Sequence, residues 1–390
     1  MKKIALAMEN FSRYGGGAES YAVSLAETLI GNSWEVHFYG LQWDGEPKEA
    51  VFHKIDVPRF LPAGARIVAF ALKHRRAVKR IPFDVVLGFG NTISMNVYQS
   101  HGGVHWLSTE RKLYVIGHPF LRALKRLLTR LSLKHRARHW VESAPFRSSA
   151  RPKIVAISDM IREDMASYFH VDRSQIEVVY NGVDTDRYNA ALRDTRRGPL
   201  RRQFGIGDEE VVFLIVSYDL RKKGIEPLVD AAGLLMESGD RNFRIIVVGE
   251  RPYRRLSRKI ETLGLGRAVF FTGRVTRTDE YYANADVFVL PTYYDACSLV
   301  VFEAMACGLP VITTEYNGAA GILRDGVDGY VLSHPPRPEE LAGTMRLMLS
   351  EQRRREMSLA ASRNIEEYTI ARNHQQMMRI FDEASKPLLF

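Results

Sequence analysis

The sequence contains little cysteine, no long apolar run and no low-complexity tract. Cys297 and Cys307 are the only cysteines in 390 residues, which excludes a disulfide framework, and neither stands in a Cys/His zinc pattern. No stretch approaches the roughly 18 consecutive apolar residues of a transmembrane helix. The short apolar run at residues 4–8 ends at Glu9, so it indicates a buried strand and no signal peptide. These absences favour a protein of a reducing compartment that does not cross a bilayer.

What is present is an ordinary globular composition with an uneven distribution of charge. Apolar residues make up 46% of the chain and charged residues 26%, and the length predicts two or three domains. The net charge is +10, yet residues 59–153 hold 19 lysines and arginines against three acidic residues. All of the excess positive charge therefore lies in one quarter of the chain, which indicates an anionic partner.

The densest basic segment has the pattern of an amphipathic helix. Between residues 121 and 134 leucines recur at helical spacing, and the remaining face carries the cations Arg122, Lys125, Arg126 and Arg130. An anionic membrane surface would bind such a helix. Alternatively, the leucines pack into the core and leave the cations merely solvated. Nucleic acid is a third partner for this charge, but neither a recognition motif nor an aromatic-basic repeat accompanies it.

Strands and helices alternate in both halves of the chain, which is typical of parallel sheets with right-handed crossovers. The expected helices include residues 18–30, 225–236 and 371–384. The expected strands are residues 4–8, 35–39, 84–88, 97–98, 211–216, 243–248, 269–271, 287–290, 311–313 and 330–332. Together they predict an α/β protein of two doubly wound, Rossmann-like domains.

The junction between the two domains is expected within residues 179–202, because residues 193–202 are charged and lack apolar periodicity. We take residues 1–185 as the first domain and residues 186–370 as the second. Ligands of such sheets bind beyond the carboxyl ends of the strands, so the expected site is a deep cleft that the two domains face.

Two short segments have residues suited to phosphate binding. Gly15-Gly16-Gly17 lies between a strand and a helix, where glycine lets backbone amides approach an anion, although a plain tight turn has the same composition. It is not a G-x-G-x-x-G motif, which disfavours a nicotinamide enzyme. Residues 221–224, Arg-Lys-Lys-Gly, follow a buried strand and could neutralise a diphosphate, or else form a solvated loop.

A third segment, residues 295–312, is the most specific. Asp295 lies in the loop after the strand 287–290, and a helix is expected to begin near Ser298, with the amides of Leu299 and Val300 available to an anion. Glu303 stands on an otherwise apolar helix and needs a polar partner, which ribose hydroxyls would supply. The simpler alternative is an acid that answers the helix dipole.

In these features the chain resembles the retaining family 4 glycosyltransferases of GT-B fold, most of all those that extend the lipopolysaccharide core with glucose. The resemblance covers nearly the whole chain, and its most specific part is the Glu-x7-Glu motif with the following Ala-Met-Ala-Cys-Gly-Leu-Pro-Val-Ile. The supporting matches are Gly15-Gly16-Gly17-Ala18-Glu19, Asn181-Gly182-Val183-Asp184, Lys223-Gly224, Val248-Gly249, Gly273-Arg274-Val275 and Ala285-Asp286-Val287.

The resemblance implies a role for each matching residue. Asp295 contacts the transferred sugar, Lys223 with a nearby arginine stabilises the departing diphosphate, and His101 lies near the C6 hydroxyl of the sugar. A lone histidine is more often structural, which is the alternative for His101. The donor is bound by Gly16, Gly17, Gly273, Arg274, Val275, Ala296, Cys297, Ser298, Leu299, Val300 and Glu303.

Two positions depart from the family pattern. The first acid of the motif is Asp295 in place of Glu, and one methylene less shortens its reach by about 1.5 Å. Tyr218 stands where the family has an arginine. Arg221 or Lys222 must then supply that charge, and we favour Arg221 because its planar fork suits phosphate.

The implied reaction moves a hexose, with glucose from UDP-glucose as the expected case, to a hydroxyl of a membrane-linked glycan such as lipopolysaccharide core. The resemblance further implies retention by front-face attack, and a last helix, residues 371–390, that packs back on the acceptor-side first domain. No cofactor and no metal are expected, because no Asp-x-Asp pair occupies a plausible metal-binding loop after a strand. The expected partners are the nucleotide sugar, the lipid-linked acceptor and an anionic membrane, with a peripheral location on the cytoplasmic face of the inner membrane.

Three other classes remain at this point. A soluble glycosyltransferase or glycogen-type synthase shares the donor-binding half but needs no basic amphipathic helix. An epimerase of GT-B fold uses the same nucleotide cleft without an acceptor. A basic nucleic-acid-binding protein explains the charge but leaves residues 295–312 without a role.

Overall fold

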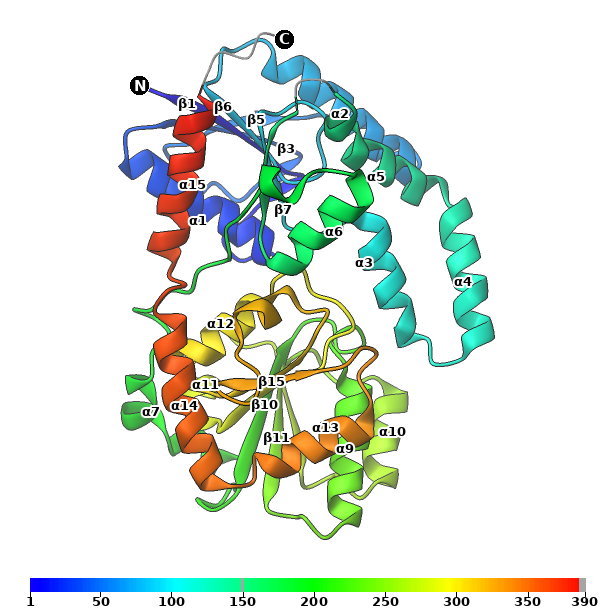
Figure 1. Ribbon diagram of the computed structural model, residues 1–390, viewed down its shortest axis with the longest axis vertical. Helices are drawn as coiled ribbons and strands as arrows, with labels where there is room; N and C mark the ends of the chain where they lie inside the picture. The colour runs from blue at the N-terminus through cyan, green and yellow to red at the C-terminus, as the bar shows by residue number, and fades with distance from the viewer. Residues whose placement is uncertain (149–150, 386–390) are drawn as a thin grey trace. The chain divides into compact units, whose positions relative to one another are not determined.

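The computed structural model describes residues 1–148 and 151–385, and the chain divides into two compact units (Figure 1). Unit one comprises Met1–Tyr180 together with the chain from Ala371 on, and unit two comprises Asn181–Ile370. Each unit is a parallel sheet with helices on its faces, so the predicted fold class of two doubly wound α/β domains is confirmed. The boundary precedes the expected residue 185, because Val183 already pairs with Thr369 of unit two.

The sheet of unit one has seven strands in the order β5-β3-β1-β6-β7-β8-β9. Its members are β1 (Lys3–Ala7), β3 (Glu35–Gly40), β5 (Val51–Lys54), β6 (Val85–Gly88), β7 (Val97–Ser100), β8 (Lys153–Ala156) and β9 (Ile176–Val178). The central strand β1 places Ile4 opposite Val36 of β3 and Val85 of β6, so its apolar run is buried on both faces. Two short strands, β2 (Asn10–Phe11) and β4 (Gln42–Trp43), form a separate pair.

The helices of unit one include one that comes from the far end of the chain. They are α1 (Gly17–Gly31), α2 (Ala63–Val78), α3 (His105–Lys112), α4 (Pro119–Leu131), α5 (Leu133–Ser143), α6 (Asp159–Phe169) and α15 (Ile370–Ala384). Met377, Ile380 and Phe381 of α15 are fully buried in the same core cluster as the β1 and α1 side chains. The last helix therefore completes the core of unit one.

The sheet of unit two has six parallel strands in the order β12-β11-β10-β13-β14-β15. Its strands are β10 (Val211–Ser217), β11 (Phe243–Gly249), β12 (Val269–Gly273), β13 (Val287–Leu290), β14 (Val311–Thr314) and β15 (Gly329–Leu332). Its helices are α7 (Ala191–Arg196), α8 (Pro199–Gln203), α9 (Ile225–Glu237), α10 (Arg254–Thr262), α11 (Thr278–Asn284), α12 (Leu299–Ala306), α13 (Pro338–Leu347) and α14 (Glu351–Ile365). The strand order reverses between β10 and β13, which marks the switch point where doubly wound sheets bind ligands.

Helix α4 stands away from the sheet of its own unit and exposes its apolar side (Figure 1). The exposed apolar side chains are Phe120, Leu121, Leu124, Leu127, Leu128 and Leu131, with exposed fractions of 44–68%. The interpretation of the leucine stripe as core-facing is therefore wrong. Arg126 instead faces its own unit, where it pairs with Glu110, and the Arg122 guanidinium lies 4.3 Å from the centre of the Tyr114 ring.

Within the residues that the structure describes, we find no helix that combines the length and the apolar character needed to span a bilayer.

Candidate functional site

The central ion pair of the candidate site joins the carboxyl ends of β10 and β13. Lys223 follows β10 and Asp295 follows β13, and the Lys223 ammonium donates to the Asp295 carboxylate. Both side chains keep about a fifth of their surface exposed, 22% and 20%. Lys223 and Asp295 are far apart in the sequence, and the strand order brings them together at the switch point. Both remain accessible to solvent.

Backbone contacts between the two loops fix this pair. The Lys222 carbonyl accepts hydrogen bonds from the Tyr293 amide at 2.9 Å and from the Thr292 hydroxyl at 3.1 Å. Gly224 has φ +78°, and a Cβ built there would lie 1.9 Å from the Pro291 carbonyl oxygen. Only glycine permits this approach, so the Lys-Gly step of the motif is a steric requirement of the loop.

Two asparagines hold the loop that leads from Asp295 into α12. The Asn317 side-chain oxygen accepts from the amides of Ser298 at 3.3 Å and Ala319 at 3.2 Å, and its NH2 group donates to the Thr313 hydroxyl at 3.0 Å. The Asn181 amide group donates to the Cys297 carbonyl at 2.9 Å.

The motif did not predict a role for Asn317, because Asn317 lies after the next strand, β14, outside the motif. The Ser298 amide is committed to this contact, whereas first-turn amides such as those of Leu299 and Val300 have no acceptor within a helix. These two amides are the ones in α12 that remain suited to an anion.

Glu303 lies one turn into α12 and already has a protein partner. The Tyr282 hydroxyl donates to Glu303 Oε2 at 2.8 Å, and the Tyr188 ring packs edge-on against Tyr282 with ring centres 5.7 Å apart. Burial raises the pKa of the Glu303 carboxyl above its usual value. The sequence analysis did not select these two tyrosines, because Tyr282 lies on α11 and Tyr188 lies in the segment before α7.

The other cations of the 221–224 segment point to separate partners. The Arg221 guanidinium stacks over the Tyr253 ring, 4.3 Å from its centre, and Lys222 pairs with Asp219. Tyr218 stacks with Arg274 at 5.4 Å. The structure therefore groups Lys223 with Asp295 and gives Arg221 and Lys222 other contacts.

The loop after β12 lies beside a cation that the sequence analysis did not select. Gly273 has φ +72°, and a Cβ there would be 3.7 Å from Arg251 Nε. Arg251 follows β11, so the cations beyond the adjacent strands β11 and β12 are Arg251 and Arg274. Gly273, Arg274 and Val275, three of the expected donor-binding residues, lie at the carboxyl end of β12.

The glycine turn of unit one is closed by its own helix. Gly16 is the N-cap of α1, and its amide donates to the Glu19 carboxylate, which also occupies the space above Gly15. An anion that binds the Gly16 amide has to displace the Glu19 carboxylate from it. Gly17 is the first residue of the helix.

His101 packs against aromatic rings after β7, and its ring is electrically neutral. The ring lies 4.6 Å from Tyr21 and 5.3 Å from Phe89, and burial lowers its pKa to about 3. Among the described residues its buried Nε2 has no hydrogen-bond partner. A neutral Nε2 without a partner suits a ligand hydroxyl, which a purely structural histidine would not need.

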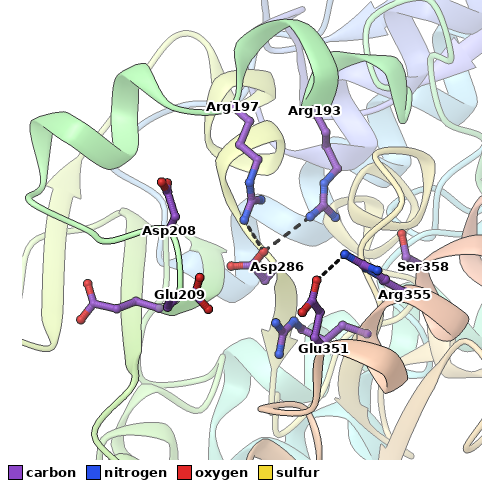
Figure 2. A pocket seen from close by; sticks show the side chains of 10 residues that line it. Arg193, Arg197, Asp208, Glu209, Asp286, Glu351, Arg355 and Ser358 are labelled. Carbon is purple, nitrogen blue, oxygen red and sulfur yellow. Dashed lines mark hydrogen bonds and ion pairs between the residues drawn. The ribbon is translucent and has the colours of Figure 1, made fainter.

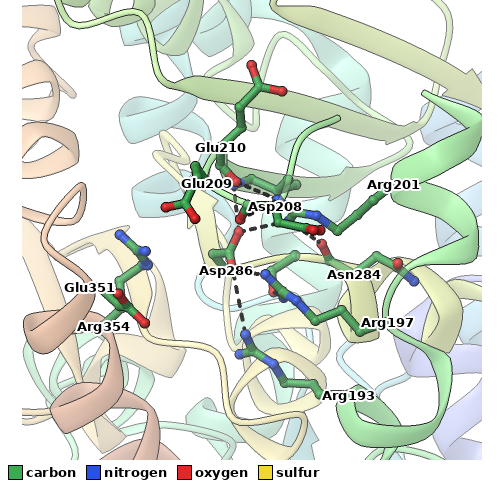
Figure 3. Close-up of polar contacts among 12 residues, drawn as sticks. Arg193, Arg197, Arg201, Asp208, Glu209, Glu210, Asn284, Asp286, Glu351 and Arg354 are labelled. Carbon is green, nitrogen blue, oxygen red and sulfur yellow. Dashed lines mark hydrogen bonds and ion pairs between the residues drawn. The ribbon is translucent and has the colours of Figure 1, made fainter. Parts of the chain in front are cut away.

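A cavity of about 330 Å³ lies at the opposite, amino end of the second sheet (Figures 2 and 3). Arg193, Arg197 and Arg201 converge on Asp286, which directly precedes β13, at 3.5, 2.7 and 3.1 Å. The Asp286 carboxylate thus has three cationic partners, and the network attaches α7 and α8 to the sheet. The charged residues 193–202 are therefore part of unit two and do not form a linker.

In the described part of the chain, no group of three or more histidine, cysteine, aspartate or glutamate side chains is arranged to hold a metal ion. Cys297 and Cys307 are both buried free thiols, and burial raises the pKa of each.

Comparison with known proteins matches both halves of the chain to families. Residues 15–187 match the model of glycosyltransferase family 4, and residues 197–366 match that of the glycosyl transferases group 1. The chain is 26% identical over 352 residues to the lipopolysaccharide glucosyltransferase WaaG of Escherichia coli K12, covering 89% of this chain and 90% of that protein. It is 29% identical over 289 residues to a D-inositol 3-phosphate glycosyltransferase of Rhodococcus erythropolis, covering 70% of this chain and 63% of that protein.

Solved structures share the fold of the whole chain. The crystal structure of WaaG aligns with a TM-score of 0.79 at 22% identity, over 97% of this chain and 99% of that one. Anabaena HepE, solved with UDP and glucose, aligns with a TM-score of 0.70 at 18% identity, over 98% and 100%. At these identities the likeness establishes the architecture, which is that of the GT-B fold.

Proposed function

The chain belongs to the family 4 glycosyltransferases of GT-B fold, and from this premise we propose that it moves a hexose from a nucleotide sugar to a hydroxyl of a membrane-linked glycan. UDP-glucose is the proposed donor, and a lipopolysaccharide core is the proposed acceptor. The names of WaaG and of the UDP-glucose-bound HepE support these choices. The reaction is proposed to need no metal ion.

The observation that carries this proposal is the Lys223–Asp295 ion pair beside the first turn of α12. When a nucleotide sugar binds, the Lys223 ammonium exchanges the carboxylate for the diphosphate, whose charge grows as the glycosidic bond breaks. The freed Asp295 carboxylate then accepts hydrogen bonds from hydroxyls of the transferred sugar. The amides of Leu299 and Val300 add positive potential at the helix N-terminus.

We propose front-face transfer with retention. The bond between the anomeric carbon and the β-phosphate oxygen breaks, and the acceptor oxygen bonds to the same face of that carbon. The departing phosphate oxygen takes the proton of the acceptor hydroxyl, so the products are the glycoside and the protonated nucleoside diphosphate. Arg221, or Lys222 in its place, joins Lys223 only if it leaves its present partner. For Gly16, Gly17 and His101, which lie in unit one, the donor contacts stay predictions.

The exposed leucines of α4 support a membrane-linked acceptor. Helices of monomeric proteins rarely present a continuous apolar stripe to water, and such a stripe marks a binding surface. Lys125 and Arg130 are exposed on the same helix and would attract anionic lipid headgroups, while Arg122 and Arg126 are engaged with unit one. We propose that this helix rests in the cytoplasmic face of the inner membrane.

A second candidate acceptor is a small phosphorylated polyol, since one relative is named a D-inositol 3-phosphate glycosyltransferase. That reaction would give the apolar surface of α4 no role. We therefore favour the membrane-linked glycan.

Transfer and stereochemistry are tested in one reaction. The protein is incubated with UDP-glucose labelled with ¹³C at C1 and with deacylated lipopolysaccharide core, and the product is followed by NMR. An α-glucoside supports the proposal. Lys223→Ala should remove its formation, and Lys259→Ala, which changes a lysine of α10 that pairs with Asp230, serves as the control. A β-glucoside would contradict retention, and no transfer from a panel of nucleotide sugars would contradict the assigned donor class.

A further inference from the structure

A second polar cavity lies in unit one, at the carboxyl ends of its strands β1, β3 and β5. It has a volume of about 250 Å³ and is lined by residues one to three positions after these strands, Glu9, Leu41 and Val57, and by side chains from α2 and α5. The three strands are neighbours in the sheet, so their carboxyl ends form one edge. This is the edge at which doubly wound sheets bind ligands.

The cavity combines cations with an apolar wall. Arg66 of α2 and both Lys134 and Arg138 of α5 supply three positive charges, and Glu9 supplies the one carboxylate. Leu41, Val57, Ile67 and Phe70 supply the apolar surface. A sugar ring has an apolar C–H face and a rim of hydroxyls, so it suits such a wall with a carboxylate beside it. The surplus of cations requires an anionic group on the same ligand.

The cations are available to a ligand. In the part of the chain that the structure describes, no carboxylate lies within 4 Å of the Arg66 guanidinium or of the Lys134 ammonium, and both side chains are exposed. Arg138 Nη1 lies 3.8 Å from Glu9 Oε1, which is longer than a hydrogen bond. Each group of this pair therefore keeps hydrogen-bonding capacity.

The walls of the cavity are fixed by close helix packing. Gly64, near the start of α2, is buried, and a Cβ there would lie 3.0 Å from the Leu133 carbonyl oxygen at the start of α5. The glycine thus lets the two helix ends approach and aligns Arg66 with Lys134 and Arg138. The close packing of α2 on α5 therefore places the three cations at one cavity, on helices and not on loops.

We propose that this cavity binds a phosphorylated monosaccharide unit of the acceptor. Its volume lies below the roughly 300–1,000 Å³ of sites for drug-sized ligands, so it suits one ring with its phosphate. Arg66, Lys134 and Arg138 hold the phosphate, and Glu9 accepts hydrogen bonds from ring hydroxyls. The inference rests on the proposed function, because it gives the acceptor of that reaction a chemical class, a glycan that carries phosphate monoesters.

The probe is glucose 6-phosphate, titrated into the intact protein by calorimetry beside glucose, inorganic phosphate and dihexanoyl phosphatidylglycerol below its micellar concentration. Glucose 6-phosphate should bind most tightly, because it alone offers both the ring and the monoester. Arg66→Gln combined with Lys134→Gln should weaken it by at least about tenfold, the value of one charge-assisted hydrogen bond. The matched control is Arg75→Gln with Arg136→Gln, exposed cations of the same two helices outside the cavity.

Several outcomes would overturn the inference. These are equal binding of glucose, equal binding of phosphate or of the phospholipid, equal weakening by the control variant, or no binding of glucose 6-phosphate. UDP binding, measured separately, distinguishes the two levels of the argument. If UDP binds and glucose 6-phosphate does not, the proposed acceptor subsite is wrong and the proposed donor site stands. If glucose 6-phosphate binds and no nucleotide does, the proposed donor chemistry is wrong and the assignment of the cavity stands.

Discussion

Two buried carboxylates show how single residues set the electrostatics of this protein. Burial disfavours the charge of Asp286, but Arg197, the Val212 amide and Arg201 hold its pKa below the usual value. Glu142 has weaker compensation. It accepts the His105 amide at 3.0 and 3.1 Å, and burial raises its pKa to about 8. Asp286 therefore stabilises the fold in its ionised form, whereas Glu142 does so in its protonated form.

The raised pKa of Glu142 makes stability depend on pH. The unfolded chain releases this proton near pH 4.5, whereas the folded chain retains it up to about pH 8, so the free energy of unfolding falls across this interval. Glu142→Gln keeps an acceptor for the His105 amide and lacks the titration. The variant should therefore gain about 1 kcal/mol or more over the wild type at pH 8, which corresponds to about 2–4 °C, and little below pH 4.5.

Thermal unfolding of both proteins at pH 4.5, 6 and 8 measures this difference. A constant difference in melting temperature at all three pH values would show that Glu142 does not carry the proton.

Among the site residues, those within a contiguous motif were predictable and their supports were not. The motif spacing selects Asp295 and Glu303 from the sequence alone, and the separate Lys223-Gly224 match selects Lys223. Tyr282 and Asn317 bind the same loop and helix, but they come from other crossover units of the sheet. No local pattern marks a tyrosine or an asparagine that reaches a neighbouring strand, so such contacts emerge only once the strand order is known.

At the scale of elements, α4 reverses the usual orientation of an amphipathic helix. The sequence predicts its periodicity correctly, but periodicity does not say which face meets water. The predicted helix also continued to residue 134, whereas the chain turns at Ser132, which has φ −66° and ψ 121°, and a new helix begins. The break separates the exposed α4 from α5, which packs on α2. Strands β5, β8 and β9, of three or four residues each, were likewise not predicted.

The leucines of α4 should carry more of the membrane affinity than its cations. Leu124→Asp with Leu128→Asp should weaken binding to anionic liposomes by about 10²-fold or more, because burial of each leucine is worth about 1.5 kcal/mol or more. Arg126→Gln should have a smaller effect, since Arg126 is paired with Glu110. Co-sedimentation with phosphatidylglycerol vesicles measures both.

The control for this prediction is Leu359→Asp, which changes a leucine of α14 in unit two that is at least as exposed as Leu124 and Leu128. If the α4 double variant sediments like the wild type, the membrane surface lies elsewhere.

At the scale of the whole molecule, the two units have separate cores, and helix α15 enters the core of the first of them. The strand-helix alternation predicts two doubly wound sheets from the sequence. The position of α15 was known only by resemblance, because an amphipathic pattern does not name the core that it enters. Its buried Phe381 lies 6.3 Å from the Trp34 ring of unit one, centre to centre.

Phe381→Ala should therefore destabilise unit one alone. Loss of a fully buried phenylalanine costs about 3–5 kcal/mol. Calorimetry should show one unfolding transition at a lower temperature and a second one unchanged, whereas Phe120→Ala, an exposed position on α4, should move neither. A downward shift of both transitions would contradict the assignment of α15 to one core.

The central claim, that the carboxyl edge of the second sheet binds a nucleotide sugar, is tested most directly by melting temperature against UDP, GDP, ADP and their glucose conjugates. A ligand that binds only the folded state raises the melting temperature by mass action. The account predicts a rise with UDP and UDP-glucose that is lost in Lys223→Ala and Glu303→Ala. The rise should be kept in Lys259→Ala, which changes a lysine of α10 paired with Asp230. No rise with any nucleotide, or a rise that Lys223→Ala leaves intact, would contradict it.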